Sequence, residues 1–299
     1  MLKCYIYANC FGKVLEQYLL LIEQFKNIYD IKVFYIMDDP KKTIDIVYLK
    51  NTDLFIYQVM SKNAFNKEDG DFYCTESIIT LLPFHCKKIS IPSCYFDGYF
   101  IDGLSQNQLP QKLKENNVMY QNKLLCEFFP NYCFNKKLFN MLSSKISIDL
   151  ILKNIQSNDF YNNSEIFDCI NSSFNRFSQK EKDNNIDIPI TNFILQNFKN
   201  KRLFNTTNHP SKFIFEYIIT ELLNKLNLTL NINPHMYDID LMKCTGRIPI
   251  FNCIINYLGI CTEFNNQFYI QNNLFETLYD YILFYKKLFE ENNITEIIN

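Results

Sequence analysis

Apolar and polar residues alternate along this chain in two distinct rhythms. Short apolar runs that end in polar or turn-forming residues are typical of buried strands, and apolar residues spaced three or four apart are typical of helices that face a core. Runs of the first kind lie at 2–8, 31–36, 53–57 and 88–91, and the helical spacing recurs over 13–28 and 75–84. This alternation predicts an α/β fold, a three-layer sandwich with a mainly parallel sheet of about five strands.

The middle of the chain, from 105 to 199, has a different character. It is polar and rich in Asn, yet large apolar residues recur in helical patches at 134–142, 147–156 and 164–180. Because a disordered linker would lack such residues, we expect a helical insertion or cap over 105–199. The whole chain, 1–299, is then a single α/β domain whose core is formed by 1–104 and 200–299.

The last hundred residues return to the first pattern. Residues 203–205 are predicted to be a fifth strand, and 211–226 a helix with apolar residues along one side. Two further helices are predicted at 249–258 and 273–291.

Composition narrows the classes of function. The 299 residues are 47% hydrophobic, with 28 Phe and 20 Tyr, which is enough for a sizeable core. There are only six glycines and no G-x-x-x-x-G-K or G-x-G-x-x-G pattern, which argues against a P-loop or a Rossmann nucleotide site. The net charge of −2 and the scattered basic residues argue against nucleic acid as a partner.

The eleven cysteines do not form a disulfide or zinc pattern. Their number is odd, no C-x-x-C occurs, and no paired ligand spacing is present, so we expect no metal. No apolar stretch approaches the roughly 18 residues of a membrane span, and the first apolar run is too short for a signal-peptide core. A cytoplasmic protein with reduced cysteines fits these features best.

Cys10 differs from the other cysteines in its position, between the first predicted strand and the first predicted helix. Open α/β sheets bind their ligands at this end of the strands. The unpaired N–H groups of a helix start stabilise a thiolate and an oxyanion, and the neighbouring Asn9 offers a further donor. The plainer interpretation remains open, in which Cys10 is a small buried apolar residue and Asn9 only ends the strand.

His209 is the candidate base. It lies in the segment Asn205 to Ser211, just before a predicted helix, and a thiol needs a base to become a nucleophile at neutral pH. Thr206, Thr207 or Asn208 would orient its imidazole. A structural role at the helix start is equally compatible with Pro210 and Ser211, which suit a first turn and a cap. The other two histidines, His85 and His235, are expected to be structural.

Polar residues at two further places complete the candidate site. Gln58 follows the strand 53–57, so its amide could donate to a developing oxyanion at the same edge of the sheet, or could simply begin a loop. Lys201, Arg202 and Arg247 are the basic residues that suit phosphate contacts, although each is more often a solvated surface charge. We predict that Cys10 and His209 share one pocket.

The residues above resemble a known family, the WcbI-type capsular polysaccharide biosynthesis enzymes proposed to be acetyltransferases. That family begins with a strand that ends in Gly-Asn-Cys-Gln, and here Ala8 and Phe11 flank Asn9 and Cys10. Further similar segments are Asp53 to Gln58, Lys88 to Tyr99, Arg202 to Thr206, Asn208 to Ser211, Arg247 to Ile250 and Leu258-Gly259. The likeness covers roughly 1–100 and 200–260.

The resemblance implies that the chain transfers an acyl group, most simply acetyl, from coenzyme A to a sugar or polysaccharide precursor. It implies that Cys10 and His209 are catalytic. From their positions we expect Asn9 and Gln58 at the oxyanion, and Ser211, Lys201, Arg202 and Arg247 at the coenzyme. Cys10 would carry the acyl group with His209 as base, or His209 would activate the acceptor directly while Cys10 shapes the site.

Two alternatives remain. The segment 206–210 is also faintly similar to the Asp-x-x-His-Pro of SGNH/GDSL hydrolases, which implies an esterase or deacylase acting on acylated sugars. Thr206 stands where those enzymes have Asp, so such a triad would lack its carboxylate. The other alternative is a non-catalytic glycan-binding protein, and Phe11 in place of Gln is the feature that favours it.

Overall fold

The computed structural model describes most of the chain, and the statements below concern that part. The described residues are 1–35, 44–64, 67–114, 118–121, 123–129, 134–144, 146–229, 238, 240–242, 246–260, 267–270 and 273–298. Their contacts group the chain into two compact units. The first consists of Met1–Ser93, Ser178–Phe193 and Lys212–Ile239, and the second of Cys94–Phe177, Ile194–Ser211 and Asp240–Asn299. The single domain with a cap over 105–199 stays a prediction.

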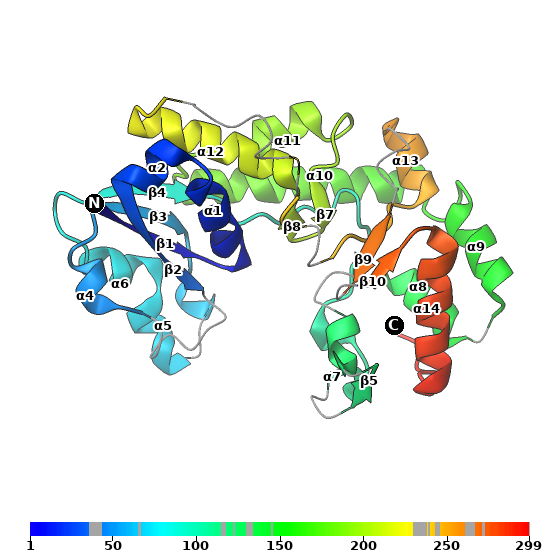
Figure 1. Ribbon diagram of the computed structural model, residues 1–299. Helices are drawn as coiled ribbons and strands as arrows, with labels where there is room; N and C mark the ends of the chain where they lie inside the picture. Colours follow the sequence, from blue (N-terminus) through cyan, green and yellow to red (C-terminus); the bar gives the residue numbers. More distant parts are fainter. Residues whose placement is uncertain are drawn as a thin grey trace. The chain divides into compact units, whose positions relative to one another are not determined.

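The first unit contains the predicted parallel sheet (Figure 1). Its strands are β1 (Leu2–Ala8), β2 (Tyr29–Tyr35), β3 (Leu54–Gln58) and β4 (Lys87–Ile91). They run parallel in the order β2-β1-β3-β4, and Ile6 in β1 stands opposite Val33 on one side and Ile56 on the other. The central strands are buried on both faces, which is why they appear in the sequence as continuous apolar runs.

Helices cover both faces of this sheet, as the three-layer prediction requires (Figure 1). One face carries α1 (Cys10–Leu20), α2 (Glu23–Ile28) and α12 (Lys212–Leu226), and the other α4 (Ile46–Leu49), α5 (Lys67–Tyr73) and α6 (Thr75–Thr80). A short 3-10 helix, η1, spans Lys62–Ala64. Tyr5, Tyr7 and Phe55 of the strands form one core with Tyr48 and Ile78 of the helices.

Gly12 lets α1 lie unusually close to the sheet. A Cβ atom at Gly12 would stand 3.0 Å from Ala8 Cβ and 3.3 Å from Val33 Cγ1. Both neighbours belong to strands, so they have little freedom to move away. The glycine two residues after Cys10 therefore sets the height of the first helical turn above β1 and β2.

The outer edge of β4 is closed by the segment around Asp187, which the sequence did not indicate. Asp187 Oδ2 accepts hydrogen bonds from the backbone N and the hydroxyl of Ser90, each at 2.8 Å, and Asp187 N donates to Ser90 Oγ at 2.8 Å. Ile188 N donates to the carbonyl of Ser90 at 3.2 Å. An edge strand covered in this way no longer offers open N–H and C=O groups.

The fifth strand was predicted for this sheet, and that placement was wrong. The described sheet has four strands, and residues 204–206 form β7 of a separate antiparallel ribbon in the second unit. The ribbon consists of β7 (Phe204–Thr206) and β8 (His209–Pro210). The two-residue turn after β7 makes β8 its antiparallel partner, whereas consecutive parallel strands are joined by a longer crossover.

The second unit extends this ribbon into a small sheet. Ile248 N donates to Asn205 O at 3.1 Å, and Arg247 and Tyr269 exchange backbone hydrogen bonds at 2.8 and 3.0 Å. Residues 247–248 thus join β7 to the hairpin of β9 (Phe268–Ile270) and β10 (Asn273–Phe275). The predicted helix at 273–291 accordingly begins later, as α14 (Leu278–Glu291).

The other elements of the second unit are mostly helices. They are η2 (Gln106–Gln108), α7 (Gln111–Lys114), β5 (Met119–Tyr120), β6 (Lys123–Leu124), η3 (Leu125–Phe128), α8 (Lys136–Ser143), α9 (Ile148–Gln156) and α13 (Asn252–Leu258). Helices α10 (Asn163–Asp183) and α11 (Thr191–Asn197) each have residues in both units. The three helical patches predicted between 134 and 180 are confirmed.

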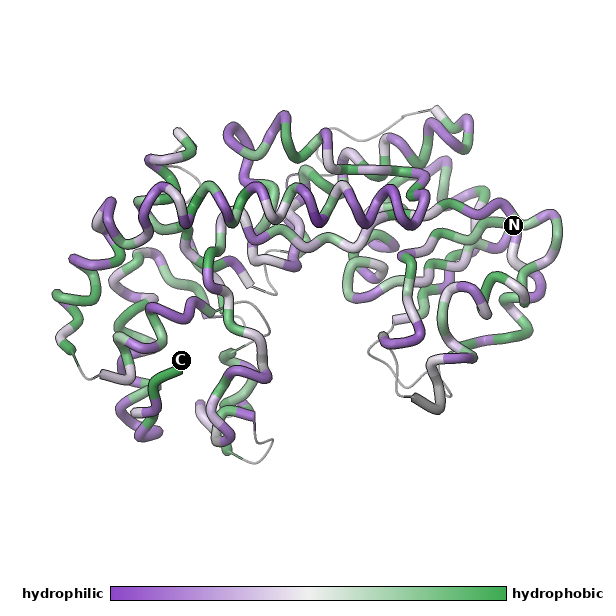
Figure 2. The backbone as a smooth tube through the Cα atoms, turned by 180° about the vertical axis from the view of Figure 1, so that it is seen from behind, coloured by the Kyte–Doolittle hydropathy of each residue, from purple (hydrophilic) through white to green (hydrophobic). Residues whose placement is uncertain are grey.

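Helix α10 shows why a polar, Asn-rich stretch still folds. Polar and apolar residues alternate along it (Figure 2), and its buried positions Ile166, Ile170, Ser173, Phe177 and Glu181 recur every three or four residues. This spacing places them on one side of the helix. None of the described helices is long and apolar enough to cross a membrane.

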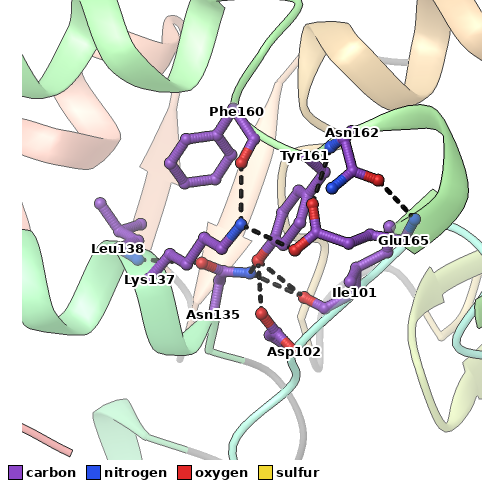
Figure 3. A network of polar contacts seen from close by, with 9 residues as sticks. All are labelled: Ile101, Asp102, Asn135, Lys137, Leu138, Phe160, Tyr161, Asn162 and Glu165. Carbon is purple, nitrogen blue, oxygen red and sulfur yellow. Dashed lines mark hydrogen bonds and ion pairs between the residues drawn. The ribbon is translucent and has the colours of Figure 1, made fainter.

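A polar network joins three segments of the second unit (Figure 3). The buried hydroxyl of Tyr161 donates to Asp102 Oδ2 at 3.2 Å and accepts from Asn135 Nδ2 at 2.7 Å. The Lys137 ammonium lies 3.9 Å from the centre of the Tyr161 ring and 3.3 Å from Glu165 Oε1. Burial raises the pKa of Tyr161, so its hydroxyl remains a donor. The network holds the start of α8 against the start of α10.

Candidate active site

Cys10 is the first residue of α1 and follows directly on β1, as predicted. Asn9 is the N-cap residue, and its Oδ1 accepts a hydrogen bond from Phe11 N at 3.0 Å. The Asn9 side chain therefore satisfies one of the free N–H groups of the first turn. In the structure the amide oxygen of Asn9 caps α1. The role of the Asn9 amide as an oxyanion donor stays a prediction.

Gln58 holds this turn to the rest of the sheet. Its side chain is fully buried at the end of β3, where Oε1 accepts from Asn9 N at 3.1 Å and Nε2 donates to Pro92 O at 3.1 Å. One amide thus connects the carboxyl ends of β1, β3 and β4. The structure brings Asn9, Cys10 and Gln58 together, and it gives Gln58 a positioning role that the sequence did not indicate.

The thiol of Cys10 is partly exposed, and its pKa is raised. Burial is the main cause, and the backbone N–H groups of Phe11 and Cys10 act in the opposite direction. The expected stabilisation of a thiolate by the helix start is therefore present but does not outweigh desolvation. At neutral pH the thiol is protonated and needs a base to react.

Phe11 occupies a core position. Its ring is 1% exposed and stacks on Phe215 of α12, with 4.3 Å between ring centres and 16° between planes. Packing between α1 and α12 accounts for an aromatic residue here. The replacement of the family's Gln by Phe is thus a change in the interior of the first unit.

His209 lies in β8, opposite Thr206 of β7. The Thr206 hydroxyl donates to Asn208 Oδ1 at 3.0 Å, and Thr207 O accepts from Phe96 N at 2.8 Å, so the turn that carries His209 is fixed at both ends. Burial lowers the pKa of His209 from 6.5 to about 4. The imidazole is therefore neutral at neutral pH, which is the form that accepts a proton.

This shift predicts an acid-sensitive stability. Below pH 6.5 the unfolded chain protonates His209 while the folded protein does not, so stability should fall from about pH 6.5 down to about pH 4 and be unaffected above pH 7. We expect the melting temperature of His209→Gln to fall less between pH 8 and pH 4.5 than that of the wild type. At pH 8 both residues are neutral, which provides the reference. An equal fall in melting temperature between pH 8 and pH 4.5 in the two proteins would contradict the prediction.

The segment 94–99 supports the His209 ribbon from within the second unit. Phe96 donates its N–H to Thr207, and its buried ring stacks on Phe204 of β7 at 5.2 Å between centres. Gly98 is required beside it, because a Cβ atom there would stand 2.4 Å from Phe96 Cζ. This supporting role was not predicted from the sequence, where the available signal was a glycine close to Phe96 and Tyr99.

We expect Gly98→Ala to lower the free energy of unfolding by about 1–3 kcal/mol, because the Phe96 ring must move out of a packed core. Denaturant unfolding measures the change. The double variant with Phe96→Leu is the control, since a smaller side chain relieves the clash. Its loss should be smaller than the sum of the two single losses. Additive losses would count against a contact between these two residues.

Arg202 is part of the framework of the second unit. It is 5% exposed, its Nε donates to Phe204 O at 3.1 Å, and its Nη2 donates to Asn205 O at 3.2 Å and to Ile248 O. These bonds hold residue 248 against β7. Burial, and then the charge of Arg247, lower the pKa of Arg202. A phosphate contact for Arg202 stays a prediction. In the structure its guanidinium donates to three backbone carbonyls.

The other candidates for the coenzyme lie in the same unit. Arg247 is half-buried in the strand segment beside β9, and the carboxylate of Asp240 partly offsets the lowering of its pKa by burial. Lys201 is half-buried and its carbonyl accepts from the Tyr99 hydroxyl at 3.2 Å. Ser211 is 3% exposed and its N donates to Leu203 O at 2.8 Å, while its hydroxyl has no hydrogen-bond partner among the residues that the structure describes. An unsatisfied buried hydroxyl suits a ligand contact.

The predicted residues thus form two groups, one in each unit. Asn9, Cys10 and Gln58 belong to the first, and His209 belongs to the second with the four candidates for the coenzyme. The pairing of Cys10 with His209 stays a prediction. Of the remaining histidines, His85 is exposed with Nε2 3.3 Å from Asp53 Oδ1, and His235 lies outside the described residues. Within the described part of the chain, no group of three or more His, Cys, Asp or Glu could hold a metal ion.

The fold and the site place this protein in the class of parallel α/β proteins that carry a partly exposed thiol between the first strand and the first helix. The family described as "Polysaccharide biosynthesis enzyme WcbI" matches residues 3–231, most of the chain. The chain belongs to the WcbI family of polysaccharide biosynthesis enzymes, and the resemblance stated from the sequence is confirmed.

One solved structure shows the same fold. It is described as WcbI, a novel polysaccharide biosynthesis enzyme, in a native form without a disulfide bond between coenzyme A and one of its cysteines. The TM-score is 0.76 at 17% sequence identity, over 98% of this chain and 92% of that one. No curated protein sequence matches the chain.

Proposed function

We propose that this protein transfers an acyl group, most simply acetyl, from coenzyme A to a sugar or glycan precursor. The observation that carries the proposal is the place of Cys10, a partly exposed thiol at the carboxyl end of β1 and the start of α1. Membership of a family of polysaccharide biosynthesis enzymes supports a glycan-related acceptor. The similar solved structure is of a native WcbI without a disulfide bond between coenzyme A and one of its cysteines. This relation to coenzyme A supports the coenzyme as donor.

The chemistry follows from the residues. His209 is half-buried and its pKa is lowered by desolvation, so its neutral imidazole would take the proton of Cys10 or of the acceptor hydroxyl. In the first case the thiolate attacks the thioester carbonyl, the coenzyme leaves as its thiol, and the acceptor then takes the acyl group from Cys10. The N–H groups at the start of α1 would stabilise the oxyanion in either case. Ser211, Lys201 and Arg247 are the proposed contacts of the coenzyme.

Release of free coenzyme thiol from acetyl-coenzyme A, with and without sugar acceptors, tests the proposal. We expect release that depends on the acceptor and a product one acetyl group heavier by mass spectrometry. An esterase would instead hydrolyse an acetylated sugar without the coenzyme. A glycan-binding protein would do neither, yet would still bind the sugar in a titration.

A second measurement tests the position of Cys10 alone. Oxidised coenzyme A, the symmetric disulfide, should exchange with the Cys10 thiolate to give a mixed disulfide and one molecule of coenzyme A thiol. Mass spectrometry of the digested protein locates the adduct. Cys169, another partly exposed cysteine, provides the matched control, because Cys169→Ser should leave the adduct in place and Cys10→Ser should remove it. An adduct spread over several cysteines would argue against a coenzyme site at Cys10.

A further inference from the structure

One backbone N–H at the start of α1 has two possible acceptors. Phe11 N donates to Asn9 Oδ1 at 3.0 Å. Phe11 N belongs to the peptide bond that directly follows Cys10, and its N–H is one of the two backbone groups that lower the pKa of the Cys10 thiol. A single N–H cannot give a full hydrogen bond to both atoms, and a thiolate is the stronger acceptor because it is charged. The side-chain oxygen of Asn9 and a thiolate at Cys10 therefore compete for the Phe11 N–H.

The backbone of this turn has little freedom to resolve the competition. Asn9 N is held by Gln58 Oε1 at 3.1 Å, and Gln58 is held in turn by Pro92 O. Gln58 is fully buried, whereas Asn9 is half-buried. The Asn9 side chain is thus the part of the turn that can change its partner while the strand ends stay in place.

Charged groups do not decide the state of the thiol. Burial and the N–H groups of Phe11 and Cys10 are the causes of its pKa shift. The next charged residues on α1 are Lys13, whose ammonium lies 4.2 Å from the centre of the Tyr35 ring, and Glu16, whose pKa is raised by burial, an effect partly offset by the charge of Lys13. The neighbouring ends of β3 and β4 carry Gln58 and Pro92, which do not titrate.

We propose that Asn9 is a positioning residue that restrains the nucleophilicity of Cys10, because its side-chain oxygen takes the Phe11 N–H that a thiolate would otherwise accept. The inference rests on the proposed role of Cys10 as nucleophile. It assigns Asn9 a role different from oxyanion donation, since Asn9 acts through Phe11 and the sulfur and touches no substrate. The resting thiol stays protonated, and rotation of the Asn9 amide would release it.

Alkylation of Cys10 by iodoacetamide between pH 6 and pH 10 tests this in the intact protein, without coenzyme. Asn9→Gly removes the competing oxygen, and Gly is tolerated at an N-cap. We expect the midpoint of its rate profile to fall by about one pH unit and the rate at pH 7 to rise about threefold, after allowing for the lower intrinsic reactivity of a more acidic thiol. Asn9→Asp keeps the cap and adds a negative charge beside the sulfur, so its midpoint should rise. Asn9→Ser keeps an uncharged cap oxygen and should behave as the wild type.

The controls separate chemistry from loosening of the fold. Cys4 is fully buried in β1, so it can be alkylated only when the first unit opens. The Cys4 rate in each variant therefore measures this opening, and the Cys10 rates are corrected for it. Ser147→Gly removes the cap of α9, whose Oγ accepts from Leu150 N at 3.3 Å, and should leave Cys10 unchanged. Shifts of Asn9→Gly and Asn9→Asp in the same direction, or no shift in either, would overturn the proposal. Opposite shifts in a protein that transfers no acetyl group would count against the proposed function alone.

Discussion

Replacing Cys10 by alanine is expected to reduce acetyl transfer by at least about 100-fold, the scale of a lost nucleophile or base. Cys10 lies at the start of α1 on the end of β1, and Asn9 and Gln58 anchor the backbone on its N-terminal side. Alanine fits the same space, so the fold should persist. Release of coenzyme thiol in the presence of an acceptor measures the effect. Activity within a few-fold of the wild type would remove Cys10 from the reaction.

His209→Ala should give a loss of about 100-fold to 10,000-fold, the range for a general base. The comparison with Cys10→Ala decides between the two mechanisms. If Cys10 carries the acyl group, brief incubation with acetyl-coenzyme A should leave one acetyl group on Cys10 in the wild type and none in the His209 variant. If His209 activates the acceptor directly, no acyl-enzyme should appear and Cys10→Ala should retain part of its activity.

Gln58→Leu serves as the matched control for these variants. It removes the bonds to Asn9 and Pro92 but leaves both proposed catalytic groups, so we expect a smaller loss of rate than in Cys10→Ala together with a lower melting temperature. A loss as large as that of Cys10→Ala in a stably folded Gln58 variant would show that the Gln58 amide takes part in the chemistry.

Arg202→Ala is expected to cause the largest loss of stability, about 3 kcal/mol or more. Three backbone carbonyls would lose a donor, although Asn205 O keeps a second one in Ile248 N at 3.1 Å. Each buried group left unsatisfied costs about 1–3 kcal/mol. Two of the carbonyls are Asn205 O of β7 and Ile248 O of the segment that pairs with β9 through Arg247. Lysine cannot replace the planar guanidinium at several carbonyls, so Arg202→Lys should restore little of the loss.

Denaturant unfolding followed by circular dichroism measures this change. The exposed neighbour Lys199 provides the control, because Lys199→Ala removes a positive charge from the same segment and should alter the free energy of unfolding by less than about 0.5 kcal/mol. Equal stability of the two variants would contradict a structural role for the Arg202 bonds.

Local patterning by itself determined the strands of the first unit and the class of its fold. The central strands are buried on both faces, so they appear in the sequence as continuous apolar runs. The helices are buried on one face, so their apolar residues recur every three or four positions. For the same reason the place of Cys10, between a strand and a helix, could be predicted from residues 2–28 alone. The helices at 134–180 were also predictable, since their buried residues keep a helical spacing in a polar stretch.

Only the tertiary structure decided which polar groups meet. Gln58 and Arg202 appear in the sequence as residues suited to a site, yet their side chains donate to backbone carbonyls far away along the chain, at Pro92 and Ile248. Local pattern cannot show this, because a buried polar side chain is stable only when its partners arrive from other segments. The place of β7 was likewise decided by the tertiary structure, because its short apolar run suited the main sheet but the strand pairs with β8 and accepts a hydrogen bond from Ile248 N.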